Sequence, residues 1–312
     1  IHDIATPALG DATKKVDRES LDEEEHWAEV MGEEGMKLLK RYETSQPEID
    51  SIIKNQGILG QTLDVADRIT YVMKDTYAVI GPVEENKTYV NFYTNTQDLI
   101  EILNRFPRIG NIYQDVGVDQ RKGEVFFNNA SQLEAFLLLR ALLHQKLYFH
   151  PISQAKDLFI VRLLEPLYSV ADQSKLTPAL LRQMKDYDLL RIIGDKYFPS
   201  APDPVVFFPD LVNWHPKFEK FEQEEEAEAR SQKLRKDENI AVIGIQKSSG
   251  FDPATRYKVK DGNRTVEFRE FNPTSARKIE GIAQSTKGVF LFYADVSEDS
   301  PTNTLLRKVL KP

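Results

Sequence analysis

The sequence predicts a mostly α-helical protein with a small lobe of mixed helix and strand at its C-terminal end. Residues 57–77 and 131–150 repeat apolar side chains at the spacing of a helix. Residues 239–312 instead contain three stretches typical of strands, and Asp261-Gly262 within the second of them is a hairpin-turn pair. These observations favour one large helical domain followed by a smaller α+β lobe.

The composition is that of an ordinary soluble globular protein, with 41% apolar and 29% charged residues among 312. No run of about 18 apolar residues is present, which argues against a membrane-spanning helix, and no signal peptide is visible. The lack of cysteine excludes disulfides, thiolate metal sites and cysteine nucleophiles, and it fits a cytoplasmic protein. The net charge of −8 argues against a generally basic nucleic-acid-binding protein, but it leaves room for a local basic patch.

Three consecutive parts are expected: a helical domain over residues 1–216, a charged connector helix over 217–238, and the α+β lobe over 239–312. The connector has its acidic residues first and its basic residues last, as the helix dipole favours. Alternation on both sides of a turn predicts a β-hairpin within 111–128, whereas 81–93 and 199–216 are expected to be irregular. Apolar periodicity predicts further helices at 27–42, 48–55, 96–106, 153–171, 177–193 and 273–286.

The helix expected at 57–77 carries polar residues where an apolar face would be expected. Asp67, Tyr71 and Asp75 are spaced i, i+4 and i+8, which places them on one stripe flanked by Asp64 and Arg68. Apolar neighbours indicate that the helix is buried, so the carboxylates need cations or a metal as partners. Ordinary helical ion pairs on a solvated face are the alternative. The packing residues expected around this stripe are Leu59, Leu63, Ile69, Val72 and Met73.

The N-terminal pair His2-Asp3 offers an imidazole nitrogen and a carboxylate oxygen to one cation. A second carboxylate from a distant helix would add a further ligand, and Asp67 is the candidate.

The helix expected at 131–150 begins with a capping-box pattern, Ser131 with Glu134, and ends before Pro151. Within it, Arg140 stands among leucines, so it needs an anionic partner if it is buried. Asp67 and Asp75 are the candidate partners.

A family resemblance rests on three groups of residues. They are His2-Asp3 followed by a Pro and a Gly, the D-R-x-x-Y-x-x-x-D pattern from Asp67 to Asp75, and R-x-x-x-H-x-x-x-Y at Arg140, His144 and Tyr148. In this combination the chain resembles the HD-domain deoxynucleoside triphosphate triphosphohydrolases. The likeness is nearest to the vertebrate branch that also carries a sterile-alpha motif, and more distant to the bacterial dGTPases.

The resemblance implies an HD-domain helical core and hydrolysis of a dNTP to a deoxynucleoside and triphosphate. A divalent metal (Mn, Mg, Fe or Zn) held by two His and two Asp would activate the water, and a homo-oligomer is expected. Carried over by position, the metal ligands are His2, Asp3 and Asp67, and the catalytic residues are Asp11 and His26. The nucleotide pocket would be lined by Arg68, Tyr71, Asp75, Arg140 and Tyr148.

The chain departs from the family pattern at several positions. Thr6 and Asp11 stand where the relatives have His, Arg68 replaces a Lys, and Phe149 replaces a Gln that helps to exclude ribonucleotides. The fourth metal ligand, a His upstream of His2, would require additional N-terminal sequence. The alternatives are an HD phosphatase or phosphodiesterase with the same metal site, and a catalytically degenerate HD protein that binds nucleotide or nucleic acid as a sensor or assembly subunit.

Overall fold

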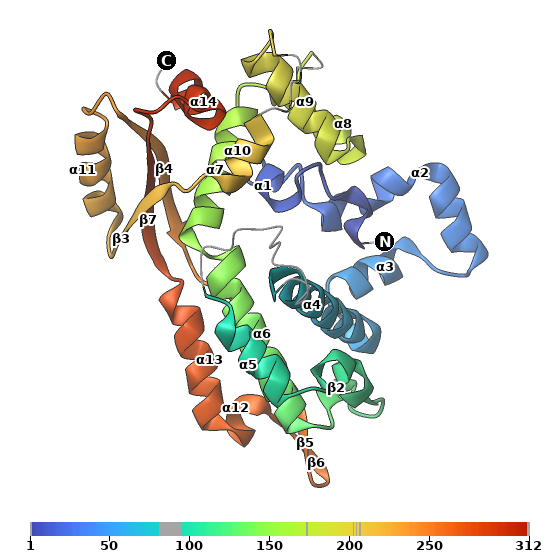
Figure 1. Cartoon of the computed structure of the whole chain (residues 1–312). Coiled ribbons are helices and arrows are strands. Elements are labelled where there is room, and N and C mark those ends of the chain that lie inside the picture. The colour runs from blue at the N-terminus through green and yellow to red at the C-terminus, as the bar shows by residue number, and fades with distance from the viewer. Residues whose placement is uncertain are drawn as a thin grey trace. The chain divides into compact units, whose positions relative to one another are not determined.

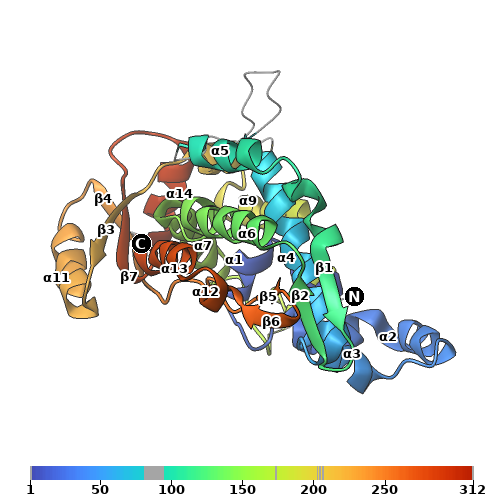
Figure 2. The same ribbon diagram turned by 90° about the horizontal axis from the view of Figure 1, so that it is seen from below.

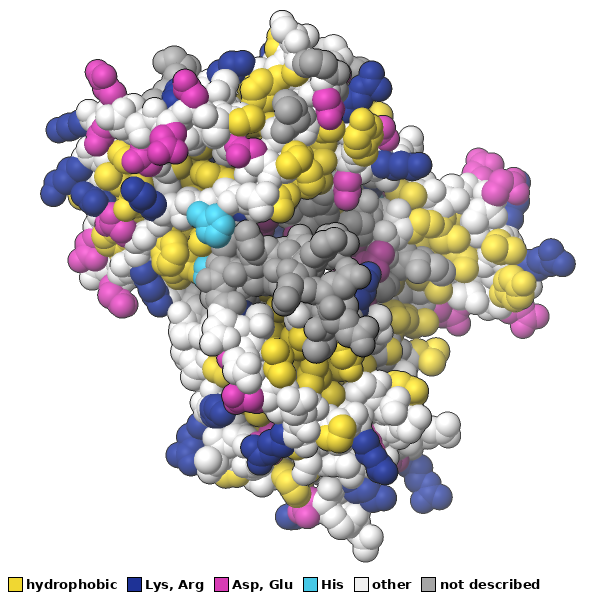
Figure 3. Space-filling model, in the orientation of Figure 1, with side chains coloured by type: hydrophobic (Ala, Val, Ile, Leu, Met, Phe, Trp, Pro, Cys, Tyr) yellow, Lys and Arg dark blue, Asp and Glu magenta, His cyan; other side chains and the backbone are white. Residues whose placement is uncertain are grey.

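The computed structural model confirms the predicted fold class, which is mostly α-helical with a small amount of sheet (Figure 1). The structure describes residues 2–80, 95–172, 174–201, 203, 205 and 207–310. None of the helices in these ranges combines the length and apolarity needed to cross a membrane. On the face seen in Figure 3, Lys and Arg side chains are interspersed with Asp and Glu side chains.

The chain forms two compact units, each of which is discontinuous in sequence. Unit 1 comprises Ile1–Gln46, Pro151–Lys247 and Gly288–Pro312, and unit 2 comprises Pro47–His150 and Ser248–Lys287. This division differs from the contiguous parts 1–216, 217–238 and 239–312 expected from the sequence, because the C-terminal region contributes strands to a different sheet in each unit.

Unit 1 packs helices and a three-stranded sheet, in the order β3-β7-β4, around an apolar core. Phe159 and Leu163 of α7 are fully buried in this core. The elements of unit 1 are η1 (His2–Ala5), α1 (Gly10–Lys14), α2 (Glu23–Arg41), α7 (Pro151–Leu164), α8 (Pro178–Gln183), α9 (Asp186–Tyr197), α10 (Phe207–Asn213), β3 (Lys217–Phe221), α11 (Glu224–Leu234), β4 (Ile240–Ser248), β7 (Gly288–Asp295) and α14 (Pro301–Leu310).

Unit 2 contains the second sheet, in the order β1-β2-β5-β6, where β5 pairs parallel to β2 and the two hairpins are antiparallel (Figure 2). Gly262, at φ 59°, makes the turn between β5 and β6 in the hairpin predicted from Asp261-Gly262. The elements of unit 2 are α3 (Gln46–Ile53), α4 (Gly57–Ile80), α5 (Gln97–Arg105), η2 (Ile109–Asp115), β1 (Val116–Asp119), β2 (Glu124–Phe127), α6 (Ala130–Leu143), η3 (His144–Tyr148), β5 (Lys258–Asp261), β6 (Arg264–Glu267), α12 (Phe268–Phe271) and α13 (Pro273–Ser285).

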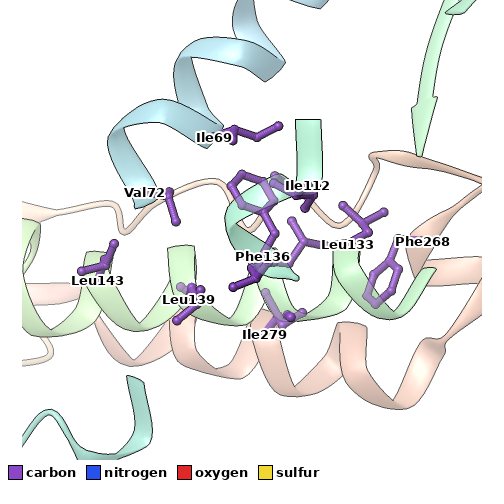
Figure 4. Packing of buried hydrophobic residues seen from close by; sticks show 14 of the residues in the cluster. Ile69, Val72, Ile112, Leu133, Phe136, Leu139, Leu143, Phe268 and Ile279 are labelled. Atoms are coloured by element: carbon purple, nitrogen blue, oxygen red, sulfur yellow. The ribbon is translucent and has the colours of Figure 1, made fainter. Parts of the chain in front are cut away.

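Helix α6 forms the centre of unit 2. It is apolar around most of its circumference, so neighbouring elements can cover it on several sides. Phe136 and Leu139 are fully buried, and they pack with Val72 of α4 and Ile279 of α13 (Figure 4). The core therefore fixes α4 and α13 against α6.

The two ends of α6 differ from the prediction. The N-cap is Asn129, whose side chain accepts hydrogen bonds from the amides of Ser131 and Gln132 at 3.1 and 3.2 Å, and not the expected Ser131. The carboxylate of Glu134 instead accepts hydrogen bonds from Asn272, the N-cap of α13, and from Ser275 in its first turn, so the capping box is not formed. At the C-terminal end the helix widens into the π-turn η3, and the amide of Phe149 donates to the carbonyl of His144.

Two other segments also differ from the prediction. Residues 217–221, expected to begin the connector helix, form strand β3, which pairs with β7 along its whole length. The helix expected at 177–193 is divided into α8 and α9, because Met184 and Lys185 adopt extended backbone conformations.

Smaller differences concern element ends and burial. Helix α7 ends at Leu164, earlier than the residue 171 expected, and the stretch 199–216 contains α10. Leu59 of α4 is 69% exposed, so it does not contribute to the packing predicted for it. The loop expected at 81–93 lies outside the described residues.

The observed cap gives a stability prediction. We expect Asn129→Ala to lower the free energy of unfolding by about 1 kcal/mol, because two helix-end amides lose their acceptor. Ser131→Ala, which removes the cap predicted from the sequence pattern, should change it by only a few tenths of that amount, since the Ser131 side chain is exposed. Urea unfolding followed by circular dichroism measures both. A larger loss for Ser131→Ala than for Asn129→Ala would contradict the assignment.

Candidate functional site

The candidate site lies within unit 2, where α4 faces α6 and η3. The i, i+4 spacing on α4 places Tyr71 and Asp75 on one stripe, and both reach residues of the second helix. The Nε of Arg140 donates to the Tyr71 hydroxyl at 3.2 Å, and the Tyr148 hydroxyl donates to the Asp75 carboxylate. The rings of Tyr71 and Tyr148 meet edge to face at 6.1 Å. The structure thus brings together four of the five residues expected in the nucleotide pocket.

Arg140 is only 5% exposed and finds its partners in two distant segments. Besides the bond to Tyr71, its Nη1 donates to the backbone carbonyl of Asp252, and its guanidinium lies 5.9 Å from the ring centre of Phe251. The prediction that Asp67 or Asp75 would be the anionic partner of Arg140 is therefore wrong. Among the described residues, no hydrogen bond involves the Nη2 of Arg140.

Arg68, the fifth predicted residue, lies beside a second tyrosine. Its Nε donates to Oδ1 of Asp64 at 2.8 Å, one helical turn earlier, and its guanidinium lies 6.0 Å from the ring centre of Tyr257. The Tyr257 hydroxyl donates to the other oxygen of Asp64 at 3.3 Å. Burial opposes the positive charge of Arg68, but Tyr257 and Asp64 favour it, and the pKa of Arg68 is raised overall.

Sequence reasoning missed three residues of this cluster, Phe251, Asp252 and Tyr257. All three come from the segment 248–287, far along the chain from α4 and α6. No motif or spacing in the sequence connects this segment with the site. The only available signal was the need of Arg140 for a partner, and a backbone carbonyl can meet that need at any residue type.

His144 lies at the centre of the cluster and is neutral at physiological pH. Burial, and after it the positive charge of Arg140, lower the pKa of His144 to about 3. Its Nδ1 lies 2.8 Å from the carbonyl of Arg140. A carbonyl can only accept, so Nδ1 carries the proton and Nε2 keeps its lone pair. The rings of Tyr148 and Phe251 lie 5.0 and 4.6 Å away.

The two tyrosine hydroxyls that donate to carboxylates stay protonated. Burial, followed by the hydrogen bond to Asp75, raises the pKa of Tyr148. Burial also raises the pKa of Tyr257, although the charge of Arg68 acts in the opposite direction. The site therefore combines two arginines and the carboxylates of Asp64 and Asp75 with neutral hydroxyls and a neutral imidazole. The guanidinium groups can donate hydrogen bonds to an anion with several oxygens.

The three predicted metal ligands belong to different units. Asp3 lies in unit 1 and Asp67 in unit 2, and both have exposed side chains, while the side chain of His2 is outside the described part of the structure. Within the described residues, no group of three His, Asp or Glu side chains is arranged to hold a metal ion.

The two predicted catalytic residues lie in unit 1, and each contacts a charged side chain. Asp11 is exposed and contacts the Nζ of Lys14 at 2.8 Å. His26 lies 2.9 Å from Glu29, which also accepts from Arg182 at 2.9 Å. The pKa of Glu29 is lowered, chiefly by the hydrogen bond from His26.

Comparisons with known proteins identify relatives by fold only. No protein-family model matches the sequence, and no curated protein matches it. Among solved structures, a phosphohydrolase from Bacteroides thetaiotaomicron is similar with a TM-score of 0.59 and 14% identity, over 94% of this chain and 77% of that chain. A hypothetical protein from Aquifex aeolicus is similar with a TM-score of 0.58 and 16% identity, over 94% of this chain and 74% of that chain. The chain therefore shares the fold of these two proteins.

The buried His144 predicts a pH dependence of stability. The unfolded chain binds a proton at this residue below about pH 6.5 and the folded chain does not, so stability falls as the pH falls from about 6.5 towards 3. His144 should contribute at most about 1.4 kcal/mol per pH unit in this window. Urea unfolding between pH 7 and 4 should give a shallower decline for His144→Phe than for the wild type. Titration of the His144 ring near pH 6.5 in a folded sample, followed by NMR, would contradict the prediction.

Proposed function

We propose that the protein is a phosphohydrolase, and that the cluster around Arg68 and Arg140 binds the phosphates of its substrate. The observation that carries the proposal is the geometry of the two arginines. Each uses its Nε for an internal hydrogen bond. Within the described part of the chain, Nη1 and Nη2 of Arg68 and Nη2 of Arg140 then remain for a ligand. Guanidinium groups fixed in this way are suited to phosphate oxygens. The phosphohydrolase among the structures of similar fold supports the same reaction class.

A dNTP is the proposed substrate. This step rests on the family motifs, whose residues Arg68, Tyr71, Asp75, Arg140 and Tyr148 occupy neighbouring positions in unit 2. Their contacts support a division of labour, in which the arginines bind the triphosphate and the two tyrosine rings and Asp75 face the sugar. Because the Asp75 carboxylate has two oxygens, it can accept a hydrogen bond from a sugar hydroxyl in addition to the one from Tyr148.

The arginines would contribute to catalysis mainly through charge. Their positions are fixed before the substrate binds, so they stabilise the negative charge that develops on the phosphate oxygens without reorganisation. His144 cannot act as an acid at neutral pH because its pKa of about 3 leaves it unprotonated. In this proposal His144 has a structural role, because it packs between Arg140 and the aromatic rings.

The proposal includes a divalent metal ion, with His2, Asp3 and Asp67 as its ligands. One imidazole and two carboxylates form a donor set that suits Mn, Mg, Fe or Zn. Such an ion would supply Lewis-acid activation of a water molecule.

A second candidate function is nucleotide binding without hydrolysis. The contacts of the two expected catalytic residues favour it, because Asp11 contacts Lys14 and His26 contacts Glu29 in unit 1. Thr6 and Asp11 also stand where the relatives have His. A phosphatase or phosphodiesterase would share the metal ligands and differ in the bond that is cleaved.

Product analysis tests the proposal directly. We expect the protein to convert a dNTP to deoxynucleoside and triphosphate when Mn²⁺ or Mg²⁺ is present, and not in the presence of chelator, as measured by anion-exchange chromatography with each dNTP and NTP. Asp67→Asn should abolish turnover because a metal ligand loses its charge. Asp195→Asn, at an exposed carboxylate of α9, is the matched control and should leave turnover unchanged.

The products also separate the alternatives. Release of orthophosphate, or of a monophosphate from a diester, would replace the triphosphohydrolase proposal with a phosphatase or phosphodiesterase. Nucleotide binding without any product would favour the binding protein. Unchanged turnover by Asp67→Asn would contradict the metal assignment.

A further inference from the structure

We propose that Tyr257 is a positioning residue that keeps the terminal nitrogens of Arg68 open to a phosphate. The proposal rests on the proposed function, because it assigns a role at the same site. It adds a residue from the segment 248–287, which no part of the motif pattern includes. Tyr257 itself would not touch the substrate.

The carboxylate of Asp64 has two oxygens that can accept hydrogen bonds. An aspartate and an arginine one helical turn apart can form a bidentate pair, in which both carboxylate oxygens accept from the guanidinium. Here the Nε of Arg68 uses Oδ1 at 2.8 Å, and the hydroxyl of Tyr257 uses Oδ2 at 3.3 Å. The tyrosine therefore occupies one acceptor position on the oxygen that a bidentate pair would need. As a result, no hydrogen bond within the described residues involves Nη1 or Nη2 of Arg68.

Unit 1 contains the same three kinds of groups in the other arrangement. Arg230 donates to both oxygens of Glu219, through Nε at 3.0 Å to each and through Nη2 at 2.8 Å. The hydroxyl of Tyr293 donates to Oε1 at 3.0 Å, the same oxygen that accepts from Nη2 of Arg230. In unit 1 the hydroxyl therefore shares its oxygen with a terminal nitrogen of the arginine, whereas in unit 2 the hydroxyl of Tyr257 lies on the oxygen of Asp64 that Arg68 does not contact.

The backbone of Tyr257 holds its hydroxyl in place. The Tyr257 amide donates to the carbonyl of Ala254 at 3.1 Å, and its carbonyl accepts from the amide of Phe268 at 2.8 Å. Its ring packs against Phe127 of β2, with 5.8 Å between ring centres. Because the residue directly precedes β5, the sheet fixes the ring beside Asp64 and Arg68. Burial keeps the hydroxyl protonated and therefore able to donate.

The test measures the affinity of the whole chain for inorganic tripolyphosphate by calorimetry, at constant ionic strength and with chelator present. Tyr257→Phe removes only the hydroxyl, and it should weaken binding by about tenfold because Asp64 can then draw the terminal nitrogens of Arg68 into a bidentate pair. Asp64→Asn in the Tyr257→Phe background should restore most of the affinity, since an amide offers a single acceptor oxygen.

Two controls distinguish this inference from the proposed function. Tyr293→Phe removes the corresponding hydroxyl in unit 1 and should leave tripolyphosphate affinity unchanged. Arg68→Gln should weaken binding at least as much as Tyr257→Phe. If it has no effect, the phosphate-binding role of Arg68 is wrong and the inference falls with it.

The positioning role has its own contrary outcomes. It is overturned if Arg68→Gln weakens binding but Tyr257→Phe does not, or if Asp64→Asn fails to restore affinity in the double variant. Thermal unfolding of each variant shows whether it is folded. If Tyr257→Phe loses affinity because it is partly unfolded, Asp64→Asn would not restore the affinity. That result would count against the proposal.

Discussion

The structure of unit 2 depends on the burial of one charged side chain. Arg140 lies on α6 among leucines, and leaving its guanidinium without partners in such surroundings would cost several kcal/mol. The fold meets this need with a hydroxyl from α4 and a backbone carbonyl from the segment 248–287. The hydrogen bonds of the Arg140 guanidinium thus join α6 to α4 and to the segment 248–287, the parts of the chain that form the candidate site.

The same burial determines the chemistry that the site can perform. Burial, and after it the charge of Arg140, lowers the pKa of His144. Burial also raises the pKa of Tyr148 and Tyr257, so all three side chains remain neutral. The positive charge of the cluster then resides on the two arginines. Because water is partly excluded, their attraction for a phosphate is stronger than it would be on an open surface.

The segment 248–287 has both a structural and a chemical role in unit 2. It adds strands β5 and β6 to the hairpin β1–β2, and it places α13 against α6. The same segment supplies Asp252, Phe251 and Tyr257 to the cluster. The sheet register that orders β5 therefore also orders the groups that hold the arginines, and the strand pairing and the site form together.

The sequence by itself determined the local features of this protein. Apolar periodicity placed α4 and α6, the Asp261-Gly262 pair placed a hairpin, and the spacing of four residues set Tyr71 and Asp75 on one face, because these depend only on neighbours along the chain. Only the tertiary structure decided that Lys217–Phe221 is a strand and that Asn129 caps α6. It alone also paired Arg140 with Asp252 and Asp64 with Tyr257, contacts that span 112 and 193 residues. A carbonyl acceptor or a single hydroxyl leaves no periodic pattern, so packing and sheet register choose such partners.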